Sequence, residues 1–300
     1  MGGALVVGEA LIDSVVDAGR VTRHPGGSPA NVALGLARLG VSTRFHTAIG
    51  DDADGRLLRA HLDASGVVMT AESLIGRSTS EAIATLAPDG SASYEFALSW
   101  EPRPLVDLGS PRAIHVGSIA AVLAPGRSVV SDIARQGRAE GVLITFDPNV
   151  RMSLVDDAPE SGETLRTLAF MSHVTKLSDE DAAFLFPGVE DERVVDLLIE
   201  AGVAVAAVTR GSRGAYLGSG SHRVAVPPVT TAVADTVGAG DSFMAALVWS
   251  LVFGPEGWDG RPVSVSRLES IGTTAARAAA LTVSRPGADL PTLTELTSVA

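Results

Sequence analysis

Asp235-Thr-Val-Gly-Ala-Gly-Asp-Ser-Phe243 is the most informative stretch of this chain. It places three small residues directly before an apolar segment, residues 242–254, whose spacing predicts a helix. These small residues are Gly238, Ala239 and Gly240. Backbone amides left bare at the positive end of a helix form a binding site for an anion such as phosphate, and Asp241 follows where a carboxylate can take a proton from an attacking hydroxyl. On spacing alone, a tight glycine turn with Asp241 or Ser242 as a helix cap explains the stretch equally well.

Other stretches along the chain combine glycine or proline with polar side chains. They are Gly26-Gly-Ser-Pro-Ala-Asn-Val-Ala-Leu-Gly-Leu-Ala-Arg-Leu-Gly40, Ile49-Gly-Asp-Asp-Ala-Asp-Gly55, Phe146-Asp-Pro-Asn-Val-Arg151, Val208-Thr-Arg-Gly-Ser-Arg-Gly214 and Ser284-Arg-Pro-Gly-Ala288. Together with D-T-x-G-A-G-D, and in this order, they resemble the signatures of the PfkB (ribokinase-like) sugar kinases over nearly the whole chain. Gly26-Gly-Ser-Pro-Ala-Asn31 and Lys176-Leu-Ser-Asp-Glu180 most resemble the fructokinases of that family.

Composition bounds the class of protein. At 300 residues, with 46% hydrophobic residues and 32 glycines, the chain suits a compact, many-turned α/β globule. Its 35 acidic and 23 basic residues give a net charge of −12 without long like-charge blocks, so we expect no nucleic-acid partner. The longest apolar run is far short of the ~20 residues that span a bilayer, and no basic segment precedes the first apolar stretch. We therefore expect a soluble, cytoplasmic protein with no membrane partner.

Lysine and cysteine usage excludes two kinds of site. The chain has no cysteine, which removes thiolate nucleophiles and zinc-thiolate centres. Lys176 is its single lysine and does not lie in a G-x-x-x-x-G-K-[ST] loop, so a Walker-type NTPase is excluded. Phosphate binding must then rest on backbone amides, arginines and metal.

Hydrophobic periodicity predicts one α/β domain over residues 1–300. From residue 112 onward, apolar strands (113–116, 142–146, 174–177 and 203–208) alternate with predicted helices such as 127–139 and 190–201, which favours a mostly parallel sheet. Earlier, residues 29–39 and 53–65 read as helices, and period-two patterns predict hairpins near residues 12–24 and 79–98, the second turning around residues 88–90. The resemblance implies a ribokinase-like fold in which these hairpins, approximately residues 10–25 and 77–100, form a small β-sheet lid over the sugar site.

The sugar side of the site is predicted near the N-terminus. Asp13 lies among apolar neighbours just after the first strand, where one carboxylate can accept hydrogen bonds from two sugar hydroxyls, although a turn or surface aspartate fits the spacing as well. Gly26 and Gly27 allow close approach of the backbone to a ligand, and the Asn31 amide can both donate and accept. A plain turn before a helix is the simpler alternative for these three, and the resemblance favours sugar contact for all four residues.

Polar side chains also follow the strand that ends near residue 146. Ligands of open α/β sheets bind beyond the carboxyl ends of the strands, where Asp147, Asn149 and Arg151 fall. Arg151 can clamp a phosphate or a carboxylate, or form a structural ion pair with a nearby acid. The same edge of the sheet is expected to carry Lys176, which we assign to the nucleotide side.

The resemblance implies the remaining cofactor residues. Thr209, Gly211 and Gly214 resemble the nucleotide-side turn, with adenine expected between this loop and the helix over residues 273–281, although an ordinary glycine turn fits them locally. A monovalent cation such as K⁺ is implied near Asp235, Val237 and residues 282–287. Asp181 lies where the family carries N-x-x-E, a motif linked to the water shell of Mg²⁺. The chain departs from that motif with Ser178-Asp-Glu-Asp181, whose acids also suit the first turn of a helix.

The sequence predicts ATP-dependent phosphorylation of the primary hydroxyl of a small sugar, with fructose or a related ketose as substrate. In that reaction the amides of residues 238–241 hold the transferring phosphoryl group, Mg²⁺ neutralises its oxygens and Asp241 accepts the proton. A 2-keto-3-deoxygluconate, ribose or nucleoside kinase of the same family is the alternative, and a homodimer through the lid is expected. A dinucleotide oxidoreductase is disfavoured because no G-x-G-x-x-G follows the first strand. A non-catalytic sugar- or nucleotide-binding homologue is the other alternative, but it would have to retain Asp241 and the small residues before it without using them.

Overall fold

The larger of two sheets forms the centre of the molecule. The computed structural model describes residues 2–17, 19–75, 77–86, 92–151, 154 and 159–298. In spatial order the strands are β5 (Val67–Met69), β4 (Thr43–His46), β1 (Ala4–Val7), β8 (Ala113–Gly117), β9 (Leu143–Asp147), β10 (Val174–Ser178), β11 (Val205–Thr209), β12 (Ala215–Ser219) and β13 (His222–Val226). From β5 to β11 neighbouring strands are parallel, whereas β12 and β13 pair antiparallel. The predicted mostly parallel α/β sheet is confirmed.

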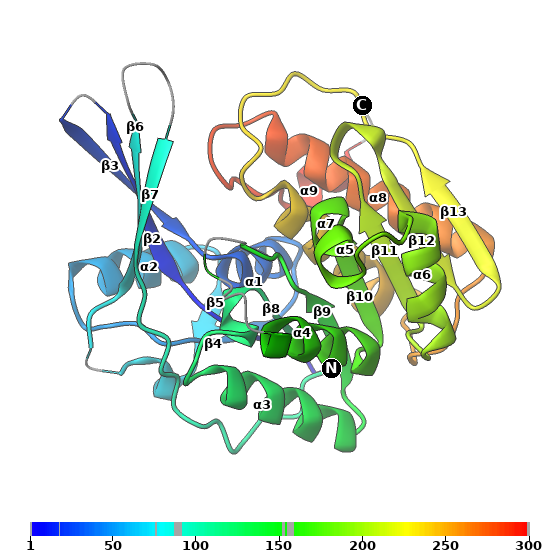
Figure 1. The fold of residues 1–300 in the computed structure, drawn as a ribbon, viewed down its shortest axis with the longest axis horizontal. Coiled ribbons are helices and arrows are strands. Elements are labelled where there is room, and N and C mark those ends of the chain that lie inside the picture. The colour runs from blue at the N-terminus through cyan, green and yellow to red at the C-terminus, as the bar shows by residue number, and fades with distance from the viewer. Residues whose placement is uncertain are drawn as a thin grey trace.

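Helices cover both faces of this sheet, as Figure 1 shows. One face packs against α1 (Ser28–Arg38), α2 (Ala53–Asp63), α7 (Ala239–Val248) and α8 (Val265–Val283), with α9 (Leu293–Thr297) against α8. The other packs against α3 (Arg127–Ala139), α4 (Pro159–Met171), α5 (Asp179–Leu185) and α6 (Asp191–Glu200). Successive strand residues point to opposite faces, so Val6 joins the core under α1 and α7 while Leu5 and Val7 join the core under α3. Burial on both faces explains why these strands are apolar without alternation.

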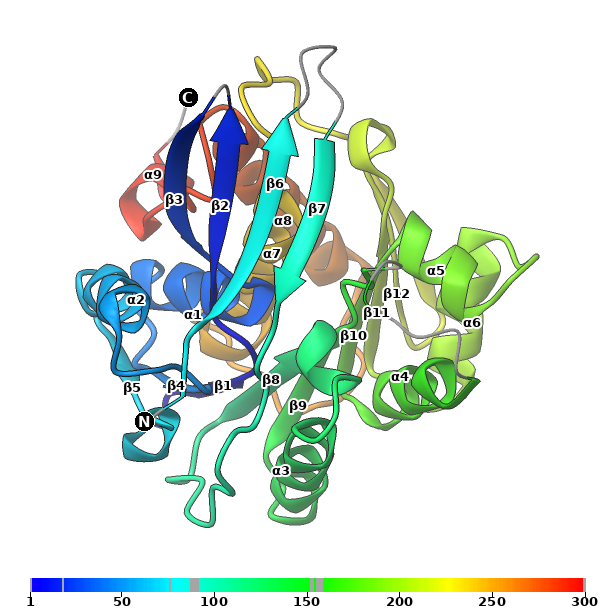
Figure 2. The same ribbon diagram turned by 60° about the vertical axis from the view of Figure 1, so that its left-hand side comes forward.

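A smaller sheet stands apart from the first. It has the order β3 (Arg20–Gly26), β2 (Leu11–Asp17), β6 (Ser80–Leu86) and β7 (Ala92–Ala97). In Figure 1 it rises from the end of the larger sheet that carries β1 and β4, and in Figure 2 it is seen nearly face-on in front of α7 and α8. Its strands occupy the two segments predicted as a lid. The turn predicted at residues 88–90 lies outside the described residues.

Several local predictions were wrong. The helix expected from residue 242 begins at Ala239, so part of the predicted glycine turn is already helical, and it continues as a π-helix over Trp249–Phe253. The antiparallel hairpin β12–β13 and the short strand β5 were missed, because short strands carry little periodic signal.

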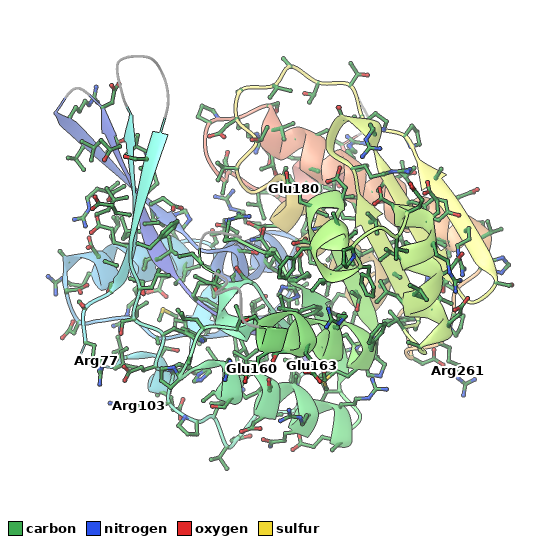
Figure 3. The ribbon with its side chains drawn as sticks, viewed as in Figure 1. Arg77, Arg103, Glu160, Glu163, Glu180 and Arg261 are labelled. Carbon is green, nitrogen blue, oxygen red and sulfur yellow. The ribbon has the colours of Figure 1, made fainter. Side chains whose placement is uncertain are left out.

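Charged side chains of both signs lie at the periphery, as Arg77, Glu160 and Arg261 illustrate in Figure 3. In the described residues, no helix combines the length and apolar character needed to cross a membrane.

Candidate active site

The N-terminus of α7 presents free backbone amides. The first hydrogen bond of the helix runs from the Ser242 N–H to the Gly238 carbonyl at 2.8 Å, so the amides of Gly240 and Asp241 have no acceptor within the helix. Gly238 caps the helix at φ 77°, a left-handed conformation, and a Cβ atom there would lie 2.7 Å from the Ala288 Cβ. The turn therefore requires glycine for its conformation and for its space.

Two cavities formed by the described residues meet at this helix end. The small-sheet cavity, of about 550 Å³, lies between the smaller sheet, α1 and the start of α7. The α8 cavity, of about 520 Å³, lies between the loop after β11, the loop over residues 228–236 and α8. Thr236 and Gly240 line both cavities. A group bound at the free amides of α7 is thus accessible from either side.

Asp241 lines the small-sheet cavity and is held by α1. Its Oδ1 accepts a hydrogen bond from the Ser28 hydroxyl and its Oδ2 one from the Asn31 amide, both at 2.7 Å. Only 7% of Asp241 is exposed. A carboxylate has about four acceptor positions, so two remain for a ligand hydroxyl. The structure therefore gives Asn31 a contact that the sequence did not predict: its side-chain amide donates a hydrogen bond to Asp241.

Asp13 approaches the same cavity from the smaller sheet. It lies on β2 opposite His24 of β3, and it lines the cavity beside Leu11. A Cβ atom on Gly26 would lie 2.0 Å from the Asp13 Oδ2, so Gly26 makes room for this carboxylate. Burial raises the pKa of Asp13 to about 6, against the opposing charges of Arg151 and His24.

Glu9 is a further carboxyl group in this cavity and was missed from the sequence. It is 5% exposed, and its Oε2 accepts the Ala120 N–H at 3.1 Å. Burial raises the pKa of Glu9 to about 7, although hydrogen bonds from Ser118 and Ala120 act in the opposite direction. The signal available in the sequence was an acidic residue among apolar neighbours, two positions after the end of the buried strand β1. Ser28, also missed, is inconspicuous because it precedes Pro29 at a helix start, where serine is common.

The loop after β9 supplies the opposite wall. Asn149 and Arg151 both line the small-sheet cavity, and Asn149 has φ 37°, in the left-handed region. Among the described residues Arg151 is exposed and forms no ion pair. The Arg151 guanidinium acts on Asp13, whose pKa its charge lowers.

Lys176 lies beneath the α7 amides rather than in a cavity wall. Its Nζ forms a 2.7 Å ion pair with the Asp147 Oδ2, and both residues are at most 3% exposed. A Cβ atom on Gly240 would lie 3.2 Å from this Nζ. Burial acts to lower the pKa of Lys176, but Asp147, Asp181 and Asp241 outweigh it and raise that pKa. The structure thus holds a positive charge close to the free amides. The sequence predicted Lys176 at the carboxyl end of its strand, whereas it lies in the middle of β10.

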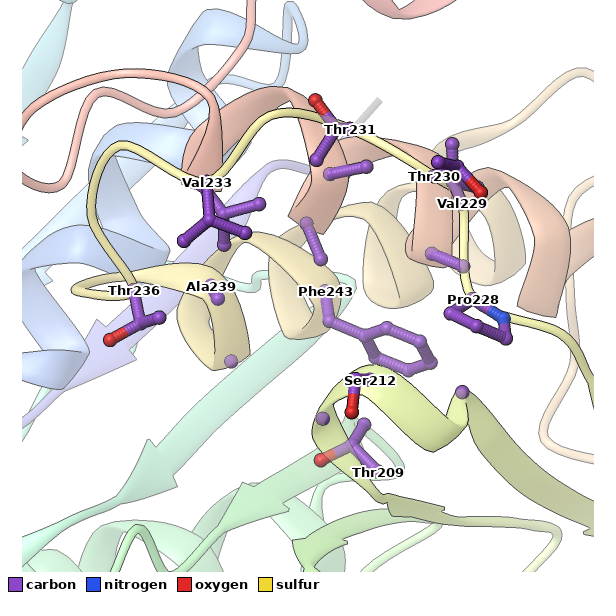
Figure 4. Close-up of a pocket in the computed structure, with 17 residues that line it drawn as sticks. Thr209, Ser212, Pro228, Val229, Thr230, Thr231, Val233, Thr236, Ala239 and Phe243 are labelled. Carbon is purple, nitrogen blue, oxygen red and sulfur yellow. The ribbon is translucent and has the colours of Figure 1, made fainter.

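In the described part of the chain, the α8 cavity is lined by three of the residues predicted for the nucleotide side, whereas Lys176 and Asp235 do not line it. Thr209, Gly211 and Gly214 line one side and Ala276, Ala279 and Ala280 of α8 the other. Val229, Val233 and Phe243 supply further apolar surface (Figure 4). A largely apolar cavity that ends at free helix amides has the polarity that a purine and its phosphates require.

Asp235 joins two segments beside this cavity. Its Oδ1 accepts the Val237 N–H at 3.0 Å and its Oδ2 the Gly287 N–H at 2.9 Å. The Asp235 N–H in turn reaches the Val283 carbonyl at 3.2 Å. The stretches predicted to surround a monovalent cation are therefore adjacent, and Asp235 itself binds their backbone.

Asp181 does not present a free carboxylate. Its Oδ1 accepts the Val150 N–H at 2.7 Å and its Oδ2 the Ser178 N–H at 2.8 Å, with 2% of the residue exposed. Within the described residues it lines neither cavity, and no group of three acidic or histidine side chains there can hold a metal ion. A direct protein-held Mg²⁺ site does not fit these residues.

Comparison with known proteins gives consistent matches. Residues 4–295 match the pfkB family carbohydrate kinases. The probable fructokinase-4 of Arabidopsis thaliana is 32% identical over 97% of this chain and 94% of its own, and the fructokinase of Vibrio alginolyticus is 30% identical over 97% and 96%. A fructokinase double mutant from Vibrio cholerae O395, solved in a fructose, ADP and potassium ion bound form, superposes with a TM-score of 0.84 over 99% of this chain and 98% of its own, at 24% identity.

Proposed function

The chain belongs to the pfkB family of carbohydrate kinases, and we propose that it transfers the γ-phosphoryl group of ATP to a primary hydroxyl of fructose or a related ketose. The observation that carries this proposal is the meeting of the two cavities at the N-terminus of α7. One cavity offers hydrogen-bonding carboxylates and the other an apolar slot. Asp241 and the free amides lie between them.

The reaction follows from these positions. Asp241, oriented by Ser28 and Asn31, accepts the proton of the sugar hydroxyl as its oxygen attacks the γ-phosphorus. The bond from that phosphorus to the oxygen bridging the β- and γ-phosphates breaks, and ADP leaves. The amides of Gly240 and Asp241 and the charge of Lys176 stabilise the negative charge on the transferring group.

The nucleotide side is proposed from the same geometry. ATP would occupy the α8 cavity, with adenine between the Thr209–Gly214 loop and α8. Potassium is proposed near Asp235, supported by the potassium-bound relative. Mg²⁺ binds through phosphates and water more readily than in an all-protein cage, so we propose that it arrives with the nucleotide rather than at a preformed site.

Fructose fits the carboxylates of the small-sheet cavity. Asp13 is proposed to accept hydrogen bonds from two sugar hydroxyls, with Gly26 leaving room for its carboxylate and Gly27 and Asn149 lining the wall. One observation favours a second candidate. Arg151 is unpaired among the described residues and lines the cavity, where it would pair bidentately with the carboxylate of a sugar acid such as 2-keto-3-deoxygluconate.

A comparison of three proteins on two sugars tests both substrates. ADP release is measured for wild type, Asp13→Ala and Arg151→Ala with fructose and with 2-keto-3-deoxygluconate. For a fructokinase, Asp13→Ala should raise the KM for fructose roughly 10–150-fold, the usual effect of losing a charge-assisted hydrogen bond, with the KM for ATP nearly unchanged. Faster wild-type turnover of the acid, abolished selectively by Arg151→Ala, would overturn fructose as substrate.

A cytoplasmic location and a homodimer through the smaller sheet remain proposals. Size-exclusion chromatography with light scattering decides the oligomeric state directly.

A further inference from the structure

We propose that Asp181 is a positioning residue for the small-sheet cavity, which holds the loop after β9 in its binding conformation, and is not a metal ligand. The inference rests on the proposed function only in that it takes this cavity to be the sugar site. It assigns to α5 a part in sugar recognition, although α5 touches the cavity nowhere among the described residues.

The first observation is the saturation of the Asp181 carboxylate by backbone. The Ser178 N–H and the Val150 N–H occupy one oxygen each, and the Asp181 N–H donates back to the Ser178 hydroxyl at 3.0 Å. The bonds with Ser178 form the cap of α5, as acids in a first helical turn often do. The bond to Val150 has no part in that cap. It crosses to a different loop, 31 residues away in sequence.

The second observation is what that loop carries. Val150 lies between Asn149 and Arg151, the two residues through which this loop lines the cavity before residue 154. Asn149 is held in the left-handed region, which the surrounding structure must maintain against its intrinsic cost. The Val150 N–H bond to a buried carboxylate is charge-assisted and lies at the next peptide. It therefore fixes the direction in which both side chains leave the loop.

The third observation separates this role from metal binding. Asp181 is buried and, as far as the described residues extend, lines neither cavity, and each of its carboxylate oxygens already accepts a backbone hydrogen bond. Glu180, the next residue, is exposed and labelled in Figure 3, and it provides a matched carboxylate on the same helical turn.

The experiment compares wild type, Asp181→Asn and the control Glu180→Gln as full-length proteins. Asparagine at 181 retains one acceptor oxygen, but its amide group must face a backbone N–H. Fructose binding is measured by calorimetry without nucleotide or Mg²⁺, and the Mg²⁺ requirement of turnover is measured at saturating ATP and fructose. We expect Asp181→Asn to raise the Kd for fructose about tenfold or more and to leave the half-maximal Mg²⁺ concentration within twofold, with Glu180→Gln unchanged in both.

Hydrogen exchange gives a readout that does not depend on the sugar. The Val150 amide should exchange at least about tenfold faster in Asp181→Asn than in wild type, because its acceptor is lost or weakened. If wild type binds no fructose, the proposed substrate fails, while this exchange measurement still decides the positioning role. Unchanged exchange at Val150, or an unchanged fructose Kd with a raised Mg²⁺ requirement, would overturn the inference. Should Asp181→Asn not fold, Asp181→Glu, which keeps the charge and lengthens the side chain, is judged by the same outcomes.

Discussion

Replacement of Asp241 by asparagine tests the assignment of the proton acceptor with little change in shape. In the structure each carboxylate oxygen accepts one hydrogen bond, from Ser28 and from Asn31, at 2.7 Å. Asparagine can keep both contacts: its Oδ1 accepts from the Asn31 amide, and its Nδ2 faces the Ser28 hydroxyl, which can reverse and accept. The position and orientation of the group should therefore be retained while its capacity to take a proton is lost.

The two effects differ in size. Hydrogen bonds to a charged group contribute roughly 1.5–3 kcal/mol and neutral ones about 0.5–1.5, so exchange of both bonds should lower the free energy of unfolding by no more than about 2–3 kcal/mol. Removal of a negative charge near Glu9 and Asp13 offsets part of this loss. Loss of a positioned general base should lower kcat by ~10²–10⁴-fold, which corresponds to about 2.7–5.4 kcal/mol in the activation barrier.

The assay is steady-state ADP release at saturating ATP and sugar, with fructose and ATP binding measured separately by calorimetry. Asp63→Asn, an exposed site at the end of α2, is the control for the change in charge. Fold and ATP binding should be nearly intact in both variants, and only Asp241→Asn should lose turnover. A correctly folded Asp241→Asn protein with more than about a tenth of the wild-type kcat would refute the role of Asp241 as base.

Other predictions concern the pH response and the anion site. Asp13 is proposed to recognise sugar hydroxyls as a carboxylate, and burial raises its pKa to about 6. The Kd for fructose should therefore rise below that pH, by up to about tenfold per unit, and Asp13→Asn should flatten this rise; an equally steep rise in the variant would contradict the proposed role. Burial raises the pKa of Glu9 from its ordinary value of 4.5 to about 7. The stability that the protonated side chain contributes is therefore lost as the pH rises from about 4.5 through about 7. Denaturation at pH 5 and pH 8 should therefore show Glu9→Gln gaining about 2.5 kcal/mol over wild type between these values, and a constant difference would argue that burial does not raise the pKa of Glu9. Gly240→Val places a Cβ atom 3.2 Å from the Lys176 Nζ, between the two cavities, so kcat/KM for ATP should fall roughly 10²-fold or more. Unchanged kinetics would show that the turn serves only to cap the helix.

Much of the architecture was predictable from local pattern. Apolar strands separated by helices predicted the parallel sheet, because strands buried on both faces read as continuous apolar runs. Period-two alternation predicted the hairpins that contain β2 and β6, and the family resemblance implied that they form a separate small sheet. The glycine pattern around Gly238 predicted the anion site because only backbone without side chains can approach a phosphate closely.

The site residues were predictable only as a set of polar positions at the ends of strands. Sequence alone placed Asp13, Arg151 and Asp241 near a ligand, and all three line one cavity. The sequence did not predict the hydrogen-bond partners of the cavity carboxylates, because each partner comes from an element distant in the chain. Asn31 donates to Asp241 across 210 positions, and the Ala120 amide donates to Glu9 across 111. Which donor meets which acceptor depends on how helices pack onto the sheet.

The sequence by itself therefore determined the order of the elements, the turn that presents free amides and the polar character of the strand ends, since these depend on periodicity and on the dihedral angles that small residues allow. Only the tertiary structure decided that Lys176 lies beneath Gly240 and that the Asp181 carboxylate binds the Val150 amide, because burial and hydrogen-bond geometry arise from packing between distant segments.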